Sequence, residues 1–237
     1  MKALRPFDHG FGERPTLMSE RITYFDHSQS VITLHPWTVT LVTITAPVGF
    51  LGDRAAIIPA SMAAATDGAH YCIGTAAIRP QANKPIEFIL TMRATAFADP
   101  KFMFGFATVS TTGTANLIGG TNYVDELVCY KTTGTTNLVL QARKASGTLE
   151  SQSVSFAGGD ATWLRFHLIC TRSDTAGLGK MDLYGGADSL VRVPQLASWT
   201  VPTQFADTVS LAPQFGWLSG ANNTGLSHHM AGWRVSN

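Results

Sequence analysis

The sequence predicts an all-β fold, an antiparallel sandwich of two sheets, and three observations support this prediction. From about residue 86 onward, apolar and polar residues alternate in short runs, which is the two-residue period of half-buried strands. Gly, Ser, Thr and Asn separate the runs, at the spacing of about ten residues that is typical of sandwiches. Strands do not alternate with helical patterns, which argues against a parallel α/β sheet.

The first part of the chain predicts short strands on either side of a less regular segment. Residues 22–24 and 37–45 are rich in β-branched and aromatic side chains, which fit a pleated surface better than a helix. Residues 55–65 have an alanine-rich, helix-like composition but contain Pro59, and proline breaks a helix interior. We expect a short helix or an irregular crossover there, followed by a strand at residues 70–73.

Alternation predicts the remaining strands. The longest run, residues 86–96, places apolar side chains on one face and Glu87, Thr91 and Arg93 on the other. Turn residues such as Gly185-Gly186 stand between the runs. The further strands are predicted at residues 102–107, 124–130, 138–142, 154–156, 163–170, 181–183, 190–193, 209–211, 215–217 and 230–235.

Length and composition suggest one weakly charged domain. The chain has 237 residues, which a single large all-β domain can occupy. We expect this domain over residues 21–237, preceded by an irregular arm over residues 1–20, where prolines, glycines and charges show no period. Charged residues make up only 14%, well below the usual quarter or so. Such a surface can be buried against other subunits without desolvating many ions.

Charge and hydropathy exclude several classes of partner. The formal net charge is +1 and Lys and Arg do not cluster, whereas nucleic-acid binding needs concentrated positive charge. No stretch reaches the roughly 20 apolar residues of a membrane span, and the first 20 residues carry too many charges for a signal peptide. We therefore expect no nucleic-acid partner, no membrane partner, and synthesis in a cytoplasm.

The sequence offers no concentrated set of metal ligands. Cys72, Cys129 and Cys170 are widely spaced, which fits neither a disulfide framework nor a zinc site, so we expect reduced cysteines in the core. His228 and His229 are adjacent, and adjacent side chains on a strand point to opposite faces. Scattered oxygen donors, which lack the spacing of a calcium loop, are interpreted as turn and cap residues: Asn116, Asn122, Asp125, Asp160, Asp174, Asp182, Asn222 and Asn223. We expect no metal and no cofactor.

Residues suited to catalysis are also dispersed. Glycosidases place two carboxylates around one bond, but Asp125 and Glu126 are neighbours and would point to opposite faces of a strand. Ser151, Ser153 and His167 offer a nucleophile and a base, yet no acid lies near them in sequence and no nucleophile elbow is present. We expect that the protein is not an enzyme and has no catalytic residues.

The order of these elements resembles the concanavalin A-like (laminin-G-like) jelly roll, in particular the version found in tailed-phage structural proteins. The resemblance covers roughly residues 21–237. It rests on the following segments: Tyr24-Phe25-Asp26 with Trp37, the strand 86–97 running into 102–107, Gly158-Gly159-Asp160 before 163–166, residues 181–186, and the closing residues 231–237.

The resemblance implies a virion component, and we expect a capsid decoration (cement) protein. Such a protein would self-associate as a trimer or dimer, bind the major capsid protein on the outer surface of the shell, and be assembled in the host cytoplasm. The arm residues Arg5, Phe7, Phe11 and Arg14 are the expected contacts outside the domain. Low charge and the lack of a fibre stalk favour decoration over a tail fibre.

The alternative is a carbohydrate-binding tail or fibre module for host attachment, similar to a lectin. Trp163, Trp217 and Trp233 fall in predicted strands, where we expect them to fill the core. Trp37 and Trp199 lie beside prolines and could stack on sugars from an exposed position, although the core or a subunit interface would also suit them.

Overall fold

The computed structural model describes the backbone of residues 21–26, 37–42, 48–51, 54–57, 64–65, 68–73, 78–108 and 123–235, and the side chains of residues 64–65, 68, 78–108 and 123–227. Its strands are β1 (Arg21–Asp26), β2 (Trp37–Val42), β3 (Val48–Leu51), β4 (Arg54–Ile57), β5 (Gly68–Ile73), β6 (Pro85–Ala94), β7 (Lys101–Ala107), β8 (Glu126–Lys131), β9 (Leu138–Arg143), β10 (Glu150–Val154), β11 (Leu164–Arg172), β12 (Gly179–Ala187), β13 (Gln195–Val201), β14 (Ala212–Leu218) and β15 (Leu226–Val235).

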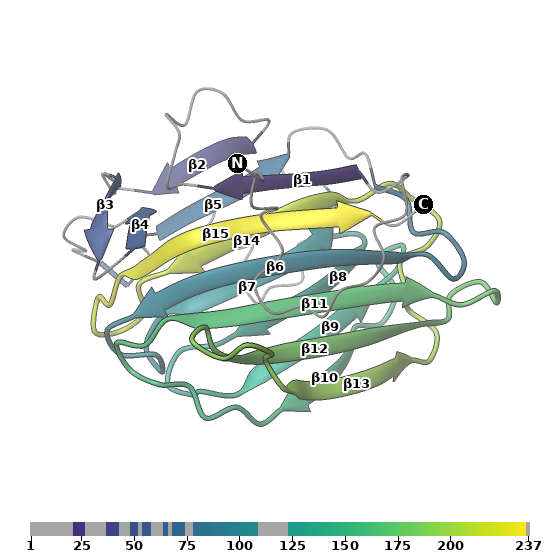
Figure 1. Cartoon of the computed structure of the whole chain (residues 1–237). Coiled ribbons are helices and arrows are strands. Elements are labelled where there is room, and N and C mark those ends of the chain that lie inside the picture. Colours follow the sequence, from purple (N-terminus) through teal and green to yellow (C-terminus); the bar gives the residue numbers. More distant parts are fainter. Residues whose placement is uncertain are drawn as a thin grey trace.

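These strands form two antiparallel sheets that pack against each other (Figure 1). One sheet has the order β13-β12-β11-β6-β15-β4-β3, with β1 also paired to β15, and the other has the order β10-β9-β8-β7-β14-β5-β2. The predicted all-β sandwich is therefore confirmed. The described ranges contain no helix with the length and apolarity needed to cross a membrane.

The alternation along β6 decides which side chains form the core. Phe88 and Leu90 are fully buried between the sheets. The ring of Phe88 lies 5.9 Å from that of Phe104 on β7, and Phe166 on β11 lies 5.9 Å from the same ring. Both sheets thus contribute to one aromatic cluster, in which each buried ring stabilises the fold by about 1.5–3 kcal/mol.

The opposite face of β6 is also shielded from solvent, which the alternation did not predict. Glu87 and Thr91 are buried there. Oε2 of Glu87 lies 2.8 Å from Nε2 of His167, on the neighbouring strand β11. A buried charge needs a partner, and this contact supplies one, so the polar positions of the strand are not solvent-exposed positions.

Three predicted elements are wrong. The strand expected at residues 209–211 is not formed, since Leu211 makes an isolated bridge with Ile78 and β14 begins at Ala212. Residues 54–57 form strand β4 in a hairpin with β3, where a helix or crossover was expected, because strand pairing outweighs the weak helical preference of an alanine-rich segment. Residues 190–193 lie in the connection after β12 and leave Leu190 and Val191 exposed. The strand in this region is β13 instead, which begins at Gln195.

The prediction for the cysteines is confirmed where the structure describes them. Cys129 and Cys170 are free and buried in the core. Burial raises the pKa of both thiols, because a thiolate is poorly solvated there. The side chain of Cys72 lies outside the described residues.

Candidate functional site at the β10–β13 edge

The candidate site is the side of the sandwich where the last strands of the two sheets lie next to each other. Among the described strands, β10 ends one sheet and β13 ends the other, and the two are in contact (Figure 1). Glu150 is the one charged residue in these two strands. Edge strands present unpaired backbone groups, which proteins usually protect with charges, prolines or bulges. At the β10–β13 edge this protection comes from Glu150, from Pro194 and Pro202 on either side of β13, and from a bulge of β13 at Leu196.

Strand β13 has an apolar inner face and a polar outer face. Ala197 and Trp199 are partly buried and pack against the core. Ser198 and Thr200, which alternate with them, are exposed. Trp199 lies on the last strand of its sheet and is only partly buried there.

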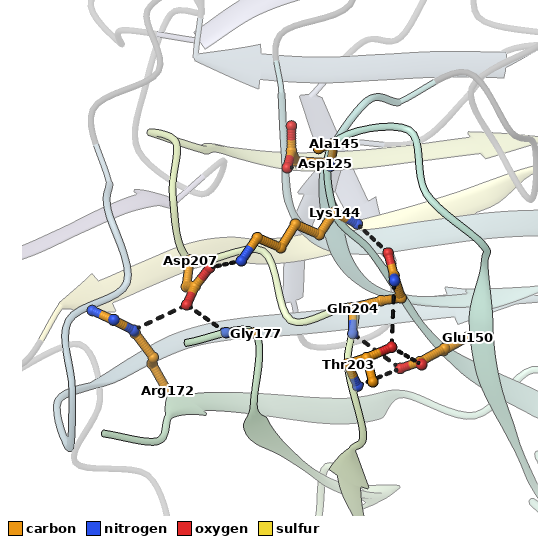
Figure 2. Close-up of polar contacts among 9 residues, drawn as sticks. All are labelled: Asp125, Lys144, Ala145, Glu150, Arg172, Gly177, Thr203, Gln204 and Asp207. Carbon is orange, nitrogen blue, oxygen red and sulfur yellow. Dashed lines mark hydrogen bonds and ion pairs between the residues drawn. The ribbon is translucent and has the colours of Figure 1, made fainter. Parts of the chain in front are cut away.

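Glu150 joins the two edge strands at one end. It is the first residue of β10, and its carboxylate accepts hydrogen bonds from the segment that follows β13 (Figure 2). The donors are the hydroxyl of Thr203 at 2.7 Å, the N–H of Thr203 at 3.3 Å and the N–H of Gln204 at 3.2 Å. Hydrogen bonds to an ionised group are stronger than neutral ones, so Glu150 fixes the position of one edge relative to the other.

A second, buried carboxylate holds the same segment. Figure 2 shows three groups converging on Asp207. Its Oδ1 lies 2.6 Å from Nζ of Lys144, in the turn after β9. Its Oδ2 lies 3.2 Å from Nε of Arg172, at the end of β11, and accepts the N–H of Gly177 at 2.8 Å. Asp207 therefore ties together three connections that would otherwise be independent.

Electrostatics keep Asp207 ionised. Burial opposes ionisation, but the Lys144 side chain, the N–H of Gly177 and the Arg172 charge outweigh it and hold the pKa of Asp207 below its usual value. The backbone of Gly177 has φ of +77°, and a Cβ there would lie 2.9 Å from the carbonyl oxygen of Thr203. The position favours glycine for both reasons. The arrangement shapes a rigid loop platform and leaves no free oxygen for chemistry.

The structure places the residues that were expected to bind a partner as follows. Arg5, Phe7, Phe11 and Arg14 lie outside the described residues. Trp37 is the first residue of β2, and its side chain is not described.

The tryptophans expected in the core divide between two environments. Trp217 is buried in the core, as predicted. Trp163 precedes β11 and is only partly buried, so its predicted place inside a strand is wrong. The side chain of Trp233, on β15, lies outside the described residues.

The carboxylates at the start of β8 are used for structure. Asp125 and Glu126 are both buried. Oδ1 of Asp125 accepts the N–H of Ala145 at 2.9 Å, and Oε1 of Glu126 accepts Nε2 of Gln141 at 2.6 Å. Burial raises the pKa of Glu126 to about 7. The two carboxylates are therefore not arranged on either side of a single glycosidic bond.

The serines and the histidine considered for catalysis are not brought together. Ser151 and Ser153 lie on β10 in one sheet, whereas His167 lies on β11 in the other and contacts Glu87. In the part of the chain that the structure describes, no three His, Cys, Asp or Glu side chains are grouped as metal ligands would be.

Among the scattered oxygen donors, Asp182 lies within strand β12, where it pairs with Lys180 and accepts Nε2 of Gln195, so its predicted place in a turn or cap is wrong. Asp160 and Asp174 lie in connections and hold loop groups, as predicted. Oδ1 of Asp160 accepts the N–H of Phe97 at 2.7 Å, and Oδ1 of Asp174 accepts Nδ2 of Asn83 at 2.9 Å. Asn116 and Asn122 lie outside the described residues, as do the side chains of His228 and His229.

Sequence reasoning missed Glu150 and Asp207, the two residues that organise this edge. Each is a single acidic residue in or beside a polar turn. No spacing rule connects either residue with its partners; Thr203, for example, lies 53 residues after Glu150 in the sequence. A signal was available for β13: a seven-residue stretch with no charge between Pro194 and Pro202.

The fold has solved relatives. No protein-family model and no curated protein matches the sequence. Among solved structures, the chain is similar to a protein of unknown function from Shewanella oneidensis MR-1, at 17% identity, with 92% of this chain and 87% of that chain covered and a TM-score of 0.55. It is also similar to the carbohydrate recognition domain of Emp47p, at 12% identity over 91% and 96% of the two chains, with a TM-score of 0.56.

A third neighbour is an enzyme, an endo-1,3-beta-glucanase from Streptomyces sioyaensis, at 12% identity over 95% of this chain and 100% of that chain, with a TM-score of 0.55. These neighbours are lectin-like jelly rolls, mostly carbohydrate-binding domains. At such identities the likeness shows the fold, the concanavalin A-like jelly roll, because one fold hosts many functions.

Proposed function

We propose that this chain is a structural virion protein of the capsid decoration type, which self-associates and binds the outer surface of a shell built from the major capsid protein. The observation that carries the proposal is the β10–β13 edge, two adjacent and almost uncharged strand edges held rigid by Glu150 and Asp207. A rigid edge loses little conformational entropy on association, and an uncharged one loses little ion hydration.

The chemistry of the carboxylates also supports a binding role over turnover. The buried acids Asp99, Asp125, Asp207 and Glu126 all accept hydrogen bonds from groups of the protein itself. A general acid or base must instead reach a substrate. The low overall charge, 14%, adds to the argument, because a subunit that is buried in an assembly carries few ions on its contact surfaces.

Binding to capsids tests the proposal. Purified virions analysed by quantitative mass spectrometry should contain this chain in hundreds of copies, the number that decoration of a shell requires. A second experiment removes residues 1–19, the expected contact arm, and should leave a folded domain that no longer sediments with capsids. A handful of copies per particle, or normal capsid binding by the truncated protein, would count against the decoration role or the role of the arm, respectively.

A second candidate function is glycan binding by a tail or fibre module. The partial exposure of Trp199 at a sheet edge favours it, since an accessible aromatic side chain can stack on a sugar. Glycan-array binding that disappears in Trp199→Ala, but not in Val191→Ala at the exposed turn before β13, is the expected result. An array without signal would remove this candidate.

A further inference from the structure

The outer face of the β6–β11 pair, the side turned away from the core, is buried. On β6, Glu87 and Thr91 point to this face, yet each is only 1% exposed, and Ile89 between them is 4% exposed. His167, on β11, is 5% exposed. An antiparallel sheet that packs one face on the core commonly leaves the other face in water. A further layer must therefore cover this face, which lies in front in Figure 1.

The described contacts at the centre of the outer face come from the sheet itself. Oε2 of Glu87 lies 2.8 Å from Nε2 of His167, and the His167 ring lies 6.0 Å from that of Tyr184 on β12. Neighbouring strands shield the sides of these groups but not their outward ends. Glu87 and His167 each have at least one further interaction besides these. A layer that lies on the face would supply it, because a buried carboxylate needs a partner.

Described connections contact the far end of the same face. Nε of Arg165, on β11, lies 3.5 Å from Oδ1 of Asp188, and its guanidinium donates to the carbonyl oxygen of Leu190 at 2.8 Å. Nε of Arg93, on β6, donates to the carbonyl oxygen of Ala161 at 2.8 Å. These contacts lie about 20 Å along β6 from Glu87. The cover over Glu87 therefore comes from outside the described ranges.

Of the stretches outside the described ranges, residues 1–20 are the best placed to cover this face. They precede Arg21, which pairs with Val235 of β15, and Val235 pairs with Ile86 of β6. The arm thus joins the sheet two strand spacings, about 10 Å, from β6, and its 20 residues can extend over about 60–70 Å. Residues 27–36 and 109–122 have to connect to strands of the other sheet, and the remaining stretches have six residues or fewer.

The arm also carries the chemistry that the outer face needs. Arg5 and Arg14 supply cations for the buried carboxylate of Glu87, and a guanidinium can donate two parallel hydrogen bonds to a carboxylate. Two phenylalanines in the same stretch supply apolar surface that can pack on Ile89. The charge and the apolar area of the face are both matched within one short segment.

From these observations we propose that residues 1–20 dock on the outer face of β6 and β11 of their own chain, with an arm arginine beside Glu87 and the arm phenylalanines over Ile89. The docked arm is then part of the domain surface in the free protein. The inference goes beyond the proposed function, because it concerns the isolated chain and holds whether or not the arm also contacts a shell.

Carboxyl labelling of the full-length protein tests the docking. A water-soluble carbodiimide with glycine ethyl ester modifies accessible carboxylates, and mass spectrometry locates them. Glu87 should be protected in the wild type, whereas Asp174, which is exposed, should be labelled. The double variant Arg5→Glu/Arg14→Glu should release the arm and raise the labelling rate of Glu87 about tenfold, because a group is labelled as often as its cover opens.

A second double variant is the matched control. Arg79→Glu/Arg192→Glu makes the same change of charge at two exposed positions outside the arm. Glu87 should remain protected in this protein. Labelling of Glu87 in both double variants would assign the effect to net charge and would overturn the arm contact.

Removal of residues 1–19 gives an independent test. In the truncated protein Glu87 should be labelled as fast as Asp174, while Glu126, buried in the other sheet, should stay protected and so report an intact fold. A synthetic peptide of residues 1–20 should bind the truncated protein and restore the protection of Glu87. The peptide should not bind the full-length protein, in which the face is already occupied.

The outcomes separate this inference from the proposed function. Protection of Glu87 that persists in the Arg5→Glu/Arg14→Glu variant and in the truncated protein would overturn the docking. Protection in the full-length protein that disappears on dilution would mean that the arm of a second copy covers the face, and docking within one chain is then wrong. If truncation unfolds the domain, the full-length double variant decides. Capsid binding is measured separately, by sedimentation with virions, and can hold or fail without either result.

Discussion

Glu126 is a single residue whose environment makes stability depend on pH. It is buried on the outer face of β8 and bonded to Gln141. Burial raises its pKa from 4.5 to about 7, because the charged form loses hydration. The folded state therefore holds the Glu126 proton more tightly than the unfolded state does, and the contribution of this group to stability is present below pH 4.5 and is lost as the pH rises through 7.

Glu126→Gln is expected to remove this pH dependence, since the amide oxygen can still accept the Gln141 hydrogen bond. At pH 8 the variant should have a free energy of unfolding about 1–3 kcal/mol above that of the wild type, measured by urea denaturation. At pH 4.5 the two proteins should be equally stable, which serves as the internal control. A constant difference at every pH would assign the effect to packing instead.

Lys131 is a second unusual residue, a lysine on the inward face of a strand. Its Nζ donates to the carbonyl oxygens of Ala98 and Thr132, each at 2.9 Å, and of Thr135 at 3.1 Å. It also lies 5.4 Å from the ring centre of Phe97. One ammonium group thus joins the β6–β7 and β8–β9 connections and is fully buried while doing so.

Lys131→Met keeps the length of the side chain and removes its donors. Three part-buried hydrogen bonds to carbonyl groups are then lost, so the free energy of unfolding should fall by about 1–3 kcal/mol. Lys180→Met is the matched control, because the Lys180 side chain is 50% exposed and pairs with Asp182 at the surface, where such pairs contribute less than about 1 kcal/mol. If the two variants lose the same free energy of unfolding in chemical denaturation, the bonds from Lys131 to the carbonyl groups contribute no more to stability than a surface ion pair.

At the scale of elements, the connections around Asp207 decide how well the β10–β13 edge is ordered. Asp207→Asn removes the charge that Lys144 and Arg172 share. We expect a loss of about 2–3 kcal/mol at pH 7 and faster hydrogen exchange in residues 173–178 and 202–208. The loss should shrink as the pH falls below 3.8, because protonation of the wild-type carboxylate removes the same charge.

A control substitution distinguishes this role from a general effect of lost surface charge. Asp182→Asn removes the charge that pairs with the exposed Lys180 and keeps an oxygen that can accept Nε2 of Gln195, so it should change stability by less than about 0.5 kcal/mol. Hydrogen exchange that stays slow in both loops of Asp207→Asn would contradict the assigned role.

At the scale of the whole molecule, one core makes the two sheets fold together. Phe166, on β11, contacts the ring of Phe104 on β7 of the other sheet and the rings of Phe97 and Phe156 in the connections after β6 and β10. Phe166→Ala should lower the unfolding free energy by about 3–5 kcal/mol and keep a single transition that circular dichroism and tryptophan fluorescence report alike. Val191→Ala, at a side chain that is 81% exposed, should have little effect. Two separate transitions would mean that the sheets unfold independently.

The fold could be read from the sequence because alternation is a local signal. The alternation at residues 86–96 predicts strand β6 and the face of it that packs in the core, and this prediction needs no information on the partner strands. Burial of Glu87 could not be read in this way, because it depends on His167, 80 residues later. The same holds for the edge. Glu150 and Asp207 owe their roles to loops that become neighbours only after the sheets have formed.

The pairing of β13 with β12 also has a mechanical consequence. The two strands are antiparallel along Gly179–Leu183 and Ala197–Val201, so the bonds between them run perpendicular to the strand direction. A force applied along β13 loads all of these hydrogen bonds at once, in shear. A force applied across the strand would break them one after another. The β12–β13 pair is therefore expected to resist tension along the strand more strongly than tension across it.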